Sequence, residues 1–368
     1  MNQPALDASQ PRQNAHMTKS TLMKYTLIAL TILTGVSALA WGLTSILLAA
    51  ISVAVAVSLD YGLSMVMKAK GPRNTLSAAV FGLIVALSYS LGNPNSFAFG
   101  EYLGPYYTLE LIPITAPMAF GYVALISAVG MILFKKLQGM LKRKYVNPAV
   151  AAKLLVLLPF AQTILLAPAH PDSVPLNGPI GYSYTEGSNA LYAAFGALVN
   201  ACFGNVQARS ELFQVSPTQV FETLTLMKYH GWVGGASSVA VIAVGVGLFL
   251  VARKYIKWRI TLSYLLAVAV MSLVMFAVYG GDPFLRLGFE LFIGSSIFLA
   301  FFMVTDPATT PNTYAGQAVF GVGVGVLTVV IQTLMGFLGG SVLALVIMNL
   351  SSSLLDRVGT KRTLETSN

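Results

Sequence analysis

The chain has 368 residues, of which 56% are hydrophobic and only 10% are charged, and its mean hydropathy is +0.73. Soluble globular domains usually carry about 25% charged residues, so most of this chain lies away from water. The composition excludes a soluble enzyme, a disordered protein and a fibrous protein, and it predicts an all-α integral membrane protein with about ten transmembrane helices.

Ten apolar runs are long enough to be considered as membrane spans, and a long polar interval follows the fifth of them. A helix needs ~20 apolar residues to cross a bilayer, which most of these runs approach or exceed. The runs cover residues 22–40, 42–58, 74–91, 111–134, 149–167, 235–252, 260–279, 285–304, 315–334 and 336–355.

The runs divide the chain into five predicted parts. The apolar stretch at 189–203, inside the polar interval, is short for a span, and we expect an interfacial or re-entrant helix there. The parts are a disordered cytoplasmic tail (1–21), the first five transmembrane helices (22–167), a large extracytoplasmic loop (168–234), the second five helices (235–355) and a cytoplasmic tail (356–368).

The basic residues support this topology. With the N-terminus inside, nineteen of the 22 Lys and Arg residues lie on the inner side, and only Arg209, Lys228 and Arg286 lie outside. This distribution obeys the positive-inside rule and predicts that both termini are cytoplasmic. The net charge of +9 therefore reflects orientation in a lipid bilayer, and no nucleic-acid partner is expected.

Few polar residues interrupt the apolar runs. Glu290 lies in the eighth run, and it is either an ion-handling carboxylate or the i, i+4 partner of Arg286. Asp60 and Glu101 lie near span ends, where we expect them to be solvated.

The three histidines are scattered and the chain has one cysteine, so no metal site is predicted. Glycines crowd the ninth run, which predicts close helix packing: Gly321, Gly323 and Gly325.

Two polar motifs stand at the ends of apolar runs. Asn147-Pro148 precedes the fifth run, where Asn would cap a helix whose first turn holds the proline. The segment TDPATTP follows the eighth run and contains Thr305, Asp306 and Thr309. It is either a cytoplasmic turn capped by Asp306 or a polar pocket whose hydroxyls and carboxylate face a cofactor.

These motifs, together with other stretches, resemble one protein family. The carriers are YVNPAVAAKLL, then GWVGGASSVAVIAVGVGLFLVARKYIKWRITLSYLL, then FFMVTDPATTP with FGVGVGVLTVVI after it. Their order and spacing over most of residues 50–355 resemble the RnfD proteins of the Rnf-type ion-translocating electron-transfer complexes and their relatives, the NqrB proteins of the sodium-translocating NADH:quinone reductase. TDPATTP is the most specific of these elements.

The resemblance implies a flavin-bearing subunit of the bacterial inner membrane that relays electrons across it, coupled to ion transport. The cofactor would be FMN, joined through its phosphate to a threonine or bound without a covalent bond, or riboflavin. The implied partners are the other subunits of the complex and, for a covalent flavin, a flavin transferase. The chain would be a subunit of a translocase rather than an enzyme alone.

The expected attachment motif, Ser-Gly-Ala-Thr, is absent before GWVGG. The matching place reads VSPTQVFETLTLMKYHGWVGG, in which Thr223 is the nearest match and Thr225 and Thr218 are alternates. The bulk and charge of the two residues before Thr223 should hinder attachment of a phosphate. For a non-covalent flavin, the predicted polar contacts are Asn147 and the Thr305–Thr310 segment, including Asp306 and Thr309. The alternative is a diverged homologue without redox activity that serves as a membrane anchor or a solute carrier.

Overall fold

The structure is a computed structural model. The described residues are 10–41, 43–66, 75–89, 117–138, 145–157, 225, 233–253, 255–279, 283–292, 295–335 and 340–358. The stretch at 189–203 and Glu101 lie outside them, so the predictions for both stay predictions. All regular elements in the described part of the chain are helices.

Helices occupy every apolar run of the first half. A π-helix, η1, continues α5 directly, so the two together cover the described part of the fourth run. The helices are α1 (Gln10–Trp41), α2 (Leu43–Val66), α3 (Thr75–Leu87), α5 (Pro117–Val129), η1 (Gly130–Leu137) and α7 (Pro148–Leu157).

Helices also occupy every apolar run of the second half. They are α10 (Ser238–Val251), α11 (Trp258–Tyr279), α12 (Pro283–Phe292), α13 (Ser296–Phe302), α14 (Tyr314–Met335) and α15 (Gly340–Leu355).

Five helical segments in the described residues are long and apolar enough to cross a membrane, which confirms a multi-pass membrane protein of the all-α class. They are Ser20–Leu39, Leu43–Val66, Ala119–Leu137, Trp258–Val278 and Tyr314–Gln332.

Two predicted boundaries were wrong. The helix α1 begins at Gln10, so residues 10–21 are helical and not a disordered tail. Gln, Arg, Met and Lys in this stretch are good helix formers, and they extend the helix beyond its apolar part.

The eighth run is not one helix but two, α12 and α13. Ser295, which precedes α13, has φ −101° and ψ 13°, outside the helical range. Serines favour helix ends because their hydroxyl competes for backbone hydrogen bonds.

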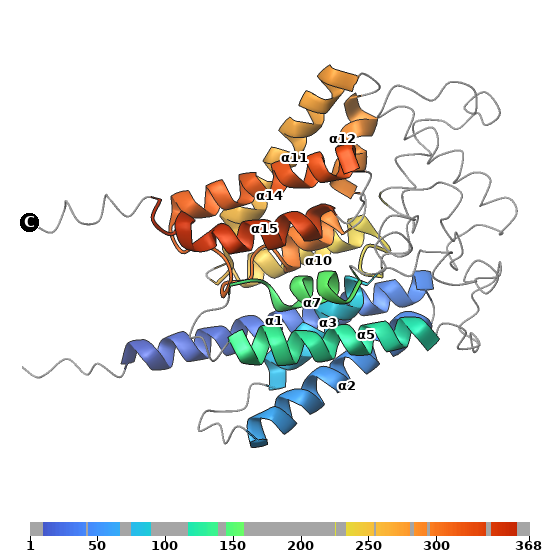
Figure 1. The fold of residues 1–368 in the computed structure, drawn as a ribbon, viewed down its shortest axis with the longest axis vertical. Helices are drawn as coiled ribbons and strands as arrows, with labels where there is room; N and C mark the ends of the chain where they lie inside the picture. Colours follow the sequence, from blue (N-terminus) through green and yellow to red (C-terminus); the bar gives the residue numbers. More distant parts are fainter. Residues whose placement is uncertain are drawn as a thin grey trace, which may run out of the picture.

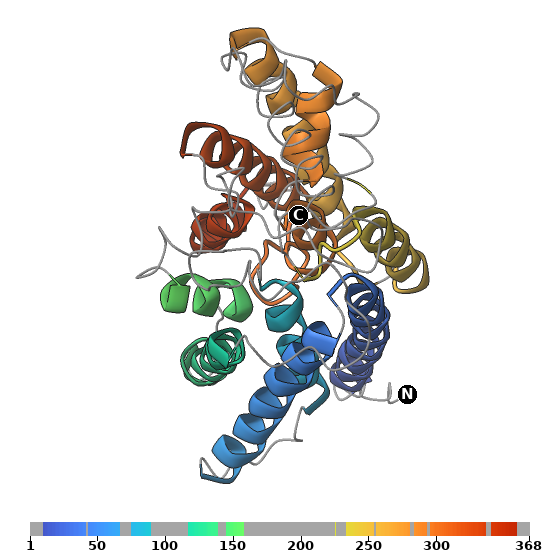
Figure 2. The ribbon, with the colours of Figure 1, turned by 90° about the vertical axis from the view of Figure 1, so that its right-hand side faces the viewer.

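The helices lie roughly side by side and form an elongated bundle (Figures 1 and 2). The helix α2 packs on α3 and α5 at one end of the bundle, and α11 packs on α14, which packs on α15, toward the other end. Between these groups, α1 contacts α3 and α10, and α7 contacts α5, η1 and α15. The short helices α7 and α13 are mostly buried, so they lie in the centre of the protein.

Glycines allow two of these helix pairs to approach at backbone distance. A Cβ atom on Gly82 of α3 would lie 2.8 Å from the Cα of Val53 in α2. A Cβ on Gly325 of α14 would lie 2.8 Å from the carbonyl oxygen of Tyr264 in α11, and Gly321, one turn earlier, faces the carbonyl of Ile260. Small residues four apart are typical of close helix contacts in membranes. The predicted packing role of the ninth-run glycines is confirmed at these positions.

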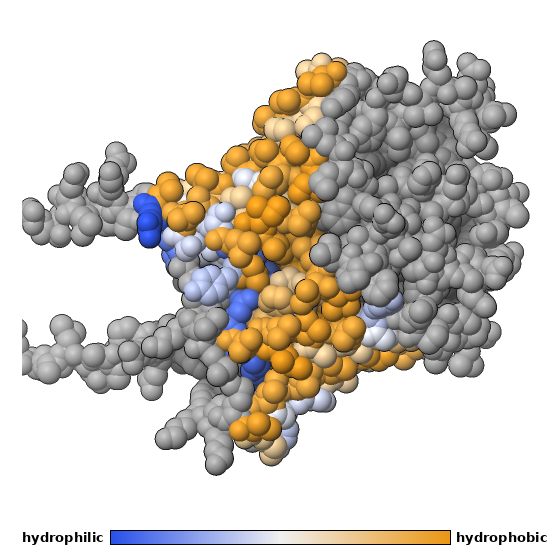
Figure 3. All heavy atoms as spheres, viewed as in Figure 1, coloured by the Kyte–Doolittle hydropathy of each residue, from blue (hydrophilic) through white to orange (hydrophobic). Residues whose placement is uncertain are grey.

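On the face of the bundle shown in Figure 3, the coloured residues form a broad apolar belt, with hydrophilic residues gathered at one edge. The beginning of α1 and the end of α15 both lie toward this edge (Figure 1). Large apolar side chains on the belt are exposed, such as Leu250 at 73% and Val278 at 67%. Soluble monomers rarely expose so large an apolar surface, and in a multi-pass membrane protein lipid covers it.

The Gly325→Ala variant tests the packing of α11 on α14. We expect it to lower the free energy of unfolding by about 1–3 kcal/mol, because the new methyl group must displace the backbone of α11. Gly247→Ala in α10 is the matched control, since a Cβ there meets nothing within 4 Å and alanine favours a helix. The measurement is the midpoint of thermal unfolding in detergent. Equal midpoints for the two variants would contradict the packing argument.

Candidate functional site

The TDPATTP segment forms a tight turn closed by Asp306. One carboxylate oxygen, Oδ1, accepts a hydrogen bond from the backbone N–H of Ala308 at 3.1 Å, and the other accepts from the Thr309 hydroxyl at 3.4 Å. The Thr310 hydroxyl donates to the backbone oxygen of Asp306 at 2.7 Å. Thr305 donates to the carbonyl of Phe301, at the end of α13. The predicted turn capped by Asp306 is therefore present.

Lys257, just before α11, holds this turn in place. Its ammonium group donates to the carbonyl oxygens of Thr310 (3.1 Å), Pro311 (3.0 Å) and Pro307 (3.4 Å), and to the side-chain oxygens of Thr310 and Asn312, both at 3.1 Å. Burial lowers the pKa of Lys257, while the nearby carboxylates of Asp306 and Asp356 oppose that shift. The surrounding oxygens favour the ammonium form, because its three N–H donors are shared among these acceptors.

Asn147 connects the same region to the first half of the chain. Its Oδ1 accepts from the N–H of Ala149 at 3.0 Å, so it caps α7, as the Asn-Pro pattern predicts. Its Nδ2 donates to the carbonyl of Met303 at 3.3 Å. Asn147 is only 4% exposed, so this bond replaces water for both buried groups. It joins the beginning of α7 to the end of α13.

A cavity of about 130 Å³ lies where these elements meet. Its polar lining residues are Thr26, Ser77, Asn147, Thr305, Asp306 and Lys135. The ammonium of Lys135 lies 5.6 Å from the Phe81 ring centre. The remaining walls are largely apolar and come from α1, α3, α10 and α13. They include Leu22, Met23, Val80, Phe81, Ile84, Leu248, Phe301 and Phe302.

The structure thus brings together three of the predicted contact residues, Asn147, Thr305 and Asp306, at one cavity. Thr309 is 2% exposed and is absent from the cavity wall, and its hydroxyl instead donates to Asp306.

Of the candidates for covalent flavin attachment, Thr223 and Thr218 lie outside the described residues. Thr225 is 7% exposed, and a buried hydroxyl is a poor target for a modifying enzyme.

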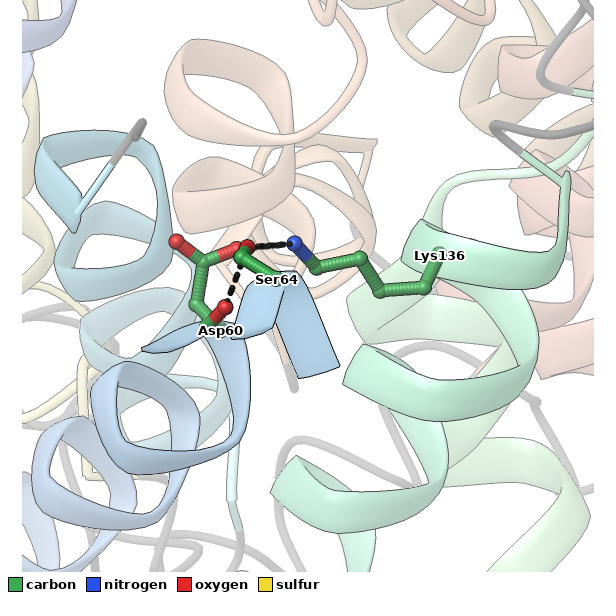
Figure 4. A network of polar contacts seen from close by, with 3 residues as sticks. All are labelled: Asp60, Ser64 and Lys136. Atoms are coloured by element: carbon green, nitrogen blue, oxygen red, sulfur yellow. Dashed lines mark hydrogen bonds and ion pairs between the residues drawn. The ribbon is translucent and has the colours of Figure 1, made fainter. Parts of the chain in front are cut away.

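Two acidic residues of the apolar runs are buried. Asp60 is 4% exposed and forms an ion pair with Lys136 at 2.7 Å, so the prediction that it is solvated was wrong (Figure 4). A carboxylate inside a helical bundle is stable only with a cationic partner.

Glu290 in α12 is fully buried. The side chain of Arg286 lies outside the described residues, so the two alternatives for Glu290 stay open.

The lysines were missed as site residues. Lys257 and Lys135 stand at the ends of apolar runs, where the positive-inside rule accounts for them without any further role. The one signal in the sequence was that Lys257 directly precedes a span, where its chain length allows it to reach a neighbouring turn. Among the described residues, no three His, Cys, Asp or Glu side chains lie close enough to hold a metal ion.

The fold and the cavity define a multi-pass, all-helical membrane protein. Its cavity is lined mostly by apolar side chains, together with a few polar ones such as the buried Asn147. The sequence profile of the NQR2, RnfD, RnfE family matches residues 109–365, so the chain belongs to this family. This confirms the resemblance found in the sequence motifs.

Relatives of known name are similar to this chain over most of their length. The Acetobacterium woodii protein designated D in the Na(+)-translocating ferredoxin:NAD(+) oxidoreductase complex is 26% identical over 96% of this chain and 93% of its own. The Ectopseudomonas mendocina protein designated D in an ion-translocating oxidoreductase complex is 28% identical over 77% and 81%. The Clostridium ljungdahlii protein designated D in the proton-translocating ferredoxin:NAD(+) oxidoreductase complex is 27% identical over 64% and 66%.

The role of Lys257 is tested by Lys257→Met. Hydrogen bonds from charged donors contribute about 1.5–3 kcal/mol each when buried, and less in this half-exposed turn, so we expect a total loss of about 2 kcal/mol of stability. Cleavage of the segment around Thr310 in limited proteolysis should also become faster. Arg253→Met, which removes an exposed charge nearby in the sequence, is the control. Unchanged cleavage in Lys257→Met would show that the turn holds without the ammonium.

Proposed function

We propose that this chain is the flavin-contacting membrane subunit of an ion-translocating electron-transfer complex of the bacterial inner membrane. The observation that carries the proposal is the convergence of Asn147 and the TDPATTP segment on one cavity, joined by the bond from Asn147 to Met303. These segments are 156 residues apart along the chain. The names of the relatives support membership of a multi-subunit complex.

The cavity suits one edge of a flavin ring. A flavin offers a flat aromatic system with a polar pyrimidine edge, and it supplies one- and two-electron transfer when bound. Phe81, Phe301 and Phe302 provide aromatic and apolar lining, and Asn147 and Thr305 are polar residues of the same lining. The cavity, of about 130 Å³, is lined mostly by apolar side chains with a few polar groups, as small-molecule sites commonly are. The bound part would be the ring of FMN or riboflavin.

The protein groups have defined tasks in this proposal. The apolar side chains exclude water from the ring and so strengthen the electrostatic effect of nearby charges. Lys135, whose ammonium lines the cavity, would favour a negatively charged, reduced ring over a neutral one. Lys257 acts indirectly, because it fixes the turn that positions Thr305 and Asp306.

The electrons would come from and go to other subunits. The chain has a single cysteine, Cys202, which cannot ligate an iron–sulfur cluster alone, and it has no nucleotide-binding glycine motif. Oxidation of the electron donor therefore belongs to partner subunits. A covalently bound FMN would also require a flavin transferase as a transient partner.

We further propose ten membrane spans with both termini cytoplasmic and residues 168–234 outside. A helix in each of the ten apolar runs supports this topology. The described ends of the chain lie toward the same hydrophilic edge of the bundle, as an even number of crossings requires (Figures 1 and 3). The cavity is lined by Lys135 and Asp306, which this topology places at the cytoplasmic side.

Non-covalent flavin is tested by Thr305→Val in the purified complex. This variant keeps the shape of the side chain and removes one hydroxyl, and we expect flavin affinity to fall about 2–10-fold, the value of one hydrogen bond. Thr31→Val is the matched control, because Thr31 is exposed and donates to a carbonyl four residues earlier, as Thr305 does. The measurement is a titration with riboflavin, followed by flavin fluorescence. Equal affinity in wild type and Thr305→Val would remove this cavity as the flavin site.

Covalent flavin is tested by fluorescence of the denatured protein in a gel, with wild type beside Thr223→Ala, Thr225→Ala and Thr218→Ala. If FMN is attached covalently, the wild-type band fluoresces and the fluorescence is lost in Thr223→Ala, since that hydroxyl best matches the attachment position. Loss in one of the other variants would move the site to that threonine. A dark wild-type band from a host with an active flavin transferase would exclude attachment. If the native complex also lacked flavin absorbance, the non-redox anchor or carrier would be favoured.

A further inference from the structure

A second polar site lies away from the cavity, between α2 and η1. Lys136 reaches from η1 and places its ammonium 2.7 Å from Oδ1 of Asp60 and 2.9 Å from the hydroxyl of Ser64 (Figure 4). Ser64 lies one turn after Asp60 in α2, and its hydroxyl donates to the backbone oxygen of Asp60 at 2.5 Å. Because the hydroxyl proton is used there, the oxygen lone pairs of Ser64 face the ammonium.

The carboxylate of Asp60 is only half satisfied. Its second oxygen, Oδ2, is buried, points away from Lys136 and has no hydrogen-bond partner among the described residues. An ionised carboxylate has about four acceptor positions, and burying one of its oxygens without a donor is costly. A cation that contacted both oxygens would satisfy this group better than the lysine does.

The two partners differ in their access to water. The side chain of Asp60 is 5% exposed and that of Lys136 is 23% exposed, so the lysine lies on the outer side of the pair. Lys136 is also the more movable partner. It is carried on a flexible four-carbon stem, at the end of a π-helix, a rare element that is frequent at functional sites. The ammonium can therefore leave the pair while Asp60 and Ser64 stay in α2.

We propose that Asp60 and Ser64 form a binding site for a small monovalent cation, Na⁺, which exchanges with the ammonium of Lys136. The site would offer Na⁺ the two carboxylate oxygens of Asp60 and the hydroxyl oxygen of Ser64, the hard ligands that such cations prefer. Its single negative charge matches one positive charge, either the lysine or the ion. No cluster of carboxylates that would favour a divalent ion is present in the described part of the chain.

The exchange gives the site two neutral states. With Lys136 in place the site is closed by an internal cation, and with Na⁺ in place the lysine is released toward the exposed side. An unpaired carboxylate at this depth is unfavourable, so the empty charged state is avoided. The proposal rests on the proposed function in that it assigns an ion site to the translocating complex. It places that site in α2 and η1, apart from the flavin cavity.

The test compares thermal unfolding of the purified complex in NaCl and in choline chloride at equal ionic strength. Lys136→Met removes the internal competitor and leaves Asp60 unpaired. We expect this variant to unfold at a lower temperature in choline and to be restored by Na⁺. Half-maximal restoration should need about tenfold less Na⁺ than the wild-type response, because the lysine no longer occupies the site.

Three other variants keep the test decisive. Asp60→Asn and the double variant Asp60→Asn/Lys136→Met should both lose the Na⁺ response, and the double variant carries no unpaired charge that would prevent folding. Lys24→Met, which removes an exposed lysine of α1, should respond as wild type does. A Na⁺ response that persists in Asp60→Asn would overturn the site. So would a Lys136→Met variant that is restored by lower pH but not by Na⁺, which would make Asp60 a proton site.

Flavin content separates this proposal from the proposed function. If the complex contains flavin but the Na⁺ titration is flat, the cation site is wrong and the redox role stands. If flavin is absent, the redox role fails whatever the titration shows.

Discussion

A polar group inside an apolar helical bundle is stable only where another polar group meets it, because neither lipid nor packed side chains replace the hydrogen bonds of water. In this protein the constraint joins segments that are distant in sequence. Asn147 meets the carbonyl of Met303, Lys257 meets the turn after α13, and Asp60 meets Lys136. Each contact gives a buried or partly buried group a polar partner, and together they set where the elements end relative to one another.

Close packing between helices also holds the bundle together. Helices in lipid gain little from the hydrophobic effect when they associate, so they depend on contact between their surfaces. Gly82 brings α3 onto α2, and Gly325 brings α14 onto α11, at distances that a methyl group would prevent. The hydroxyl of Ser52 in α2 then donates to the carbonyl of Gly82 at 2.7 Å. The cavity lies between elements of both halves, so it depends on this packing.

The candidate site was predicted in part. Asn147 and Asp306 carry recognisable local chemistry, a helix cap and a turn, and the family resemblance implied that both contact a cofactor. That Thr305 joins them at the cavity while Thr309 does not follows from the direction of each hydroxyl in the turn. Lys257 and Lys135 were predicted only as topological charges, because their partners are backbone oxygens and rings that no sequence pattern marks.

The class of the protein, its family and the apolar runs that the described helices occupy can be read from the amino-acid sequence, because hydrophobicity and charge along the chain decide what enters a membrane. The sequence did not determine that the eighth run is broken at Ser295, that α1 begins at Gln10, or that Asp60 is buried against Lys136. These features depend on the three-dimensional packing, since burial and pairing follow from which helices lie side by side. A lone aspartate near a span end has the same sequence signature whether water or a lysine from another helix satisfies it.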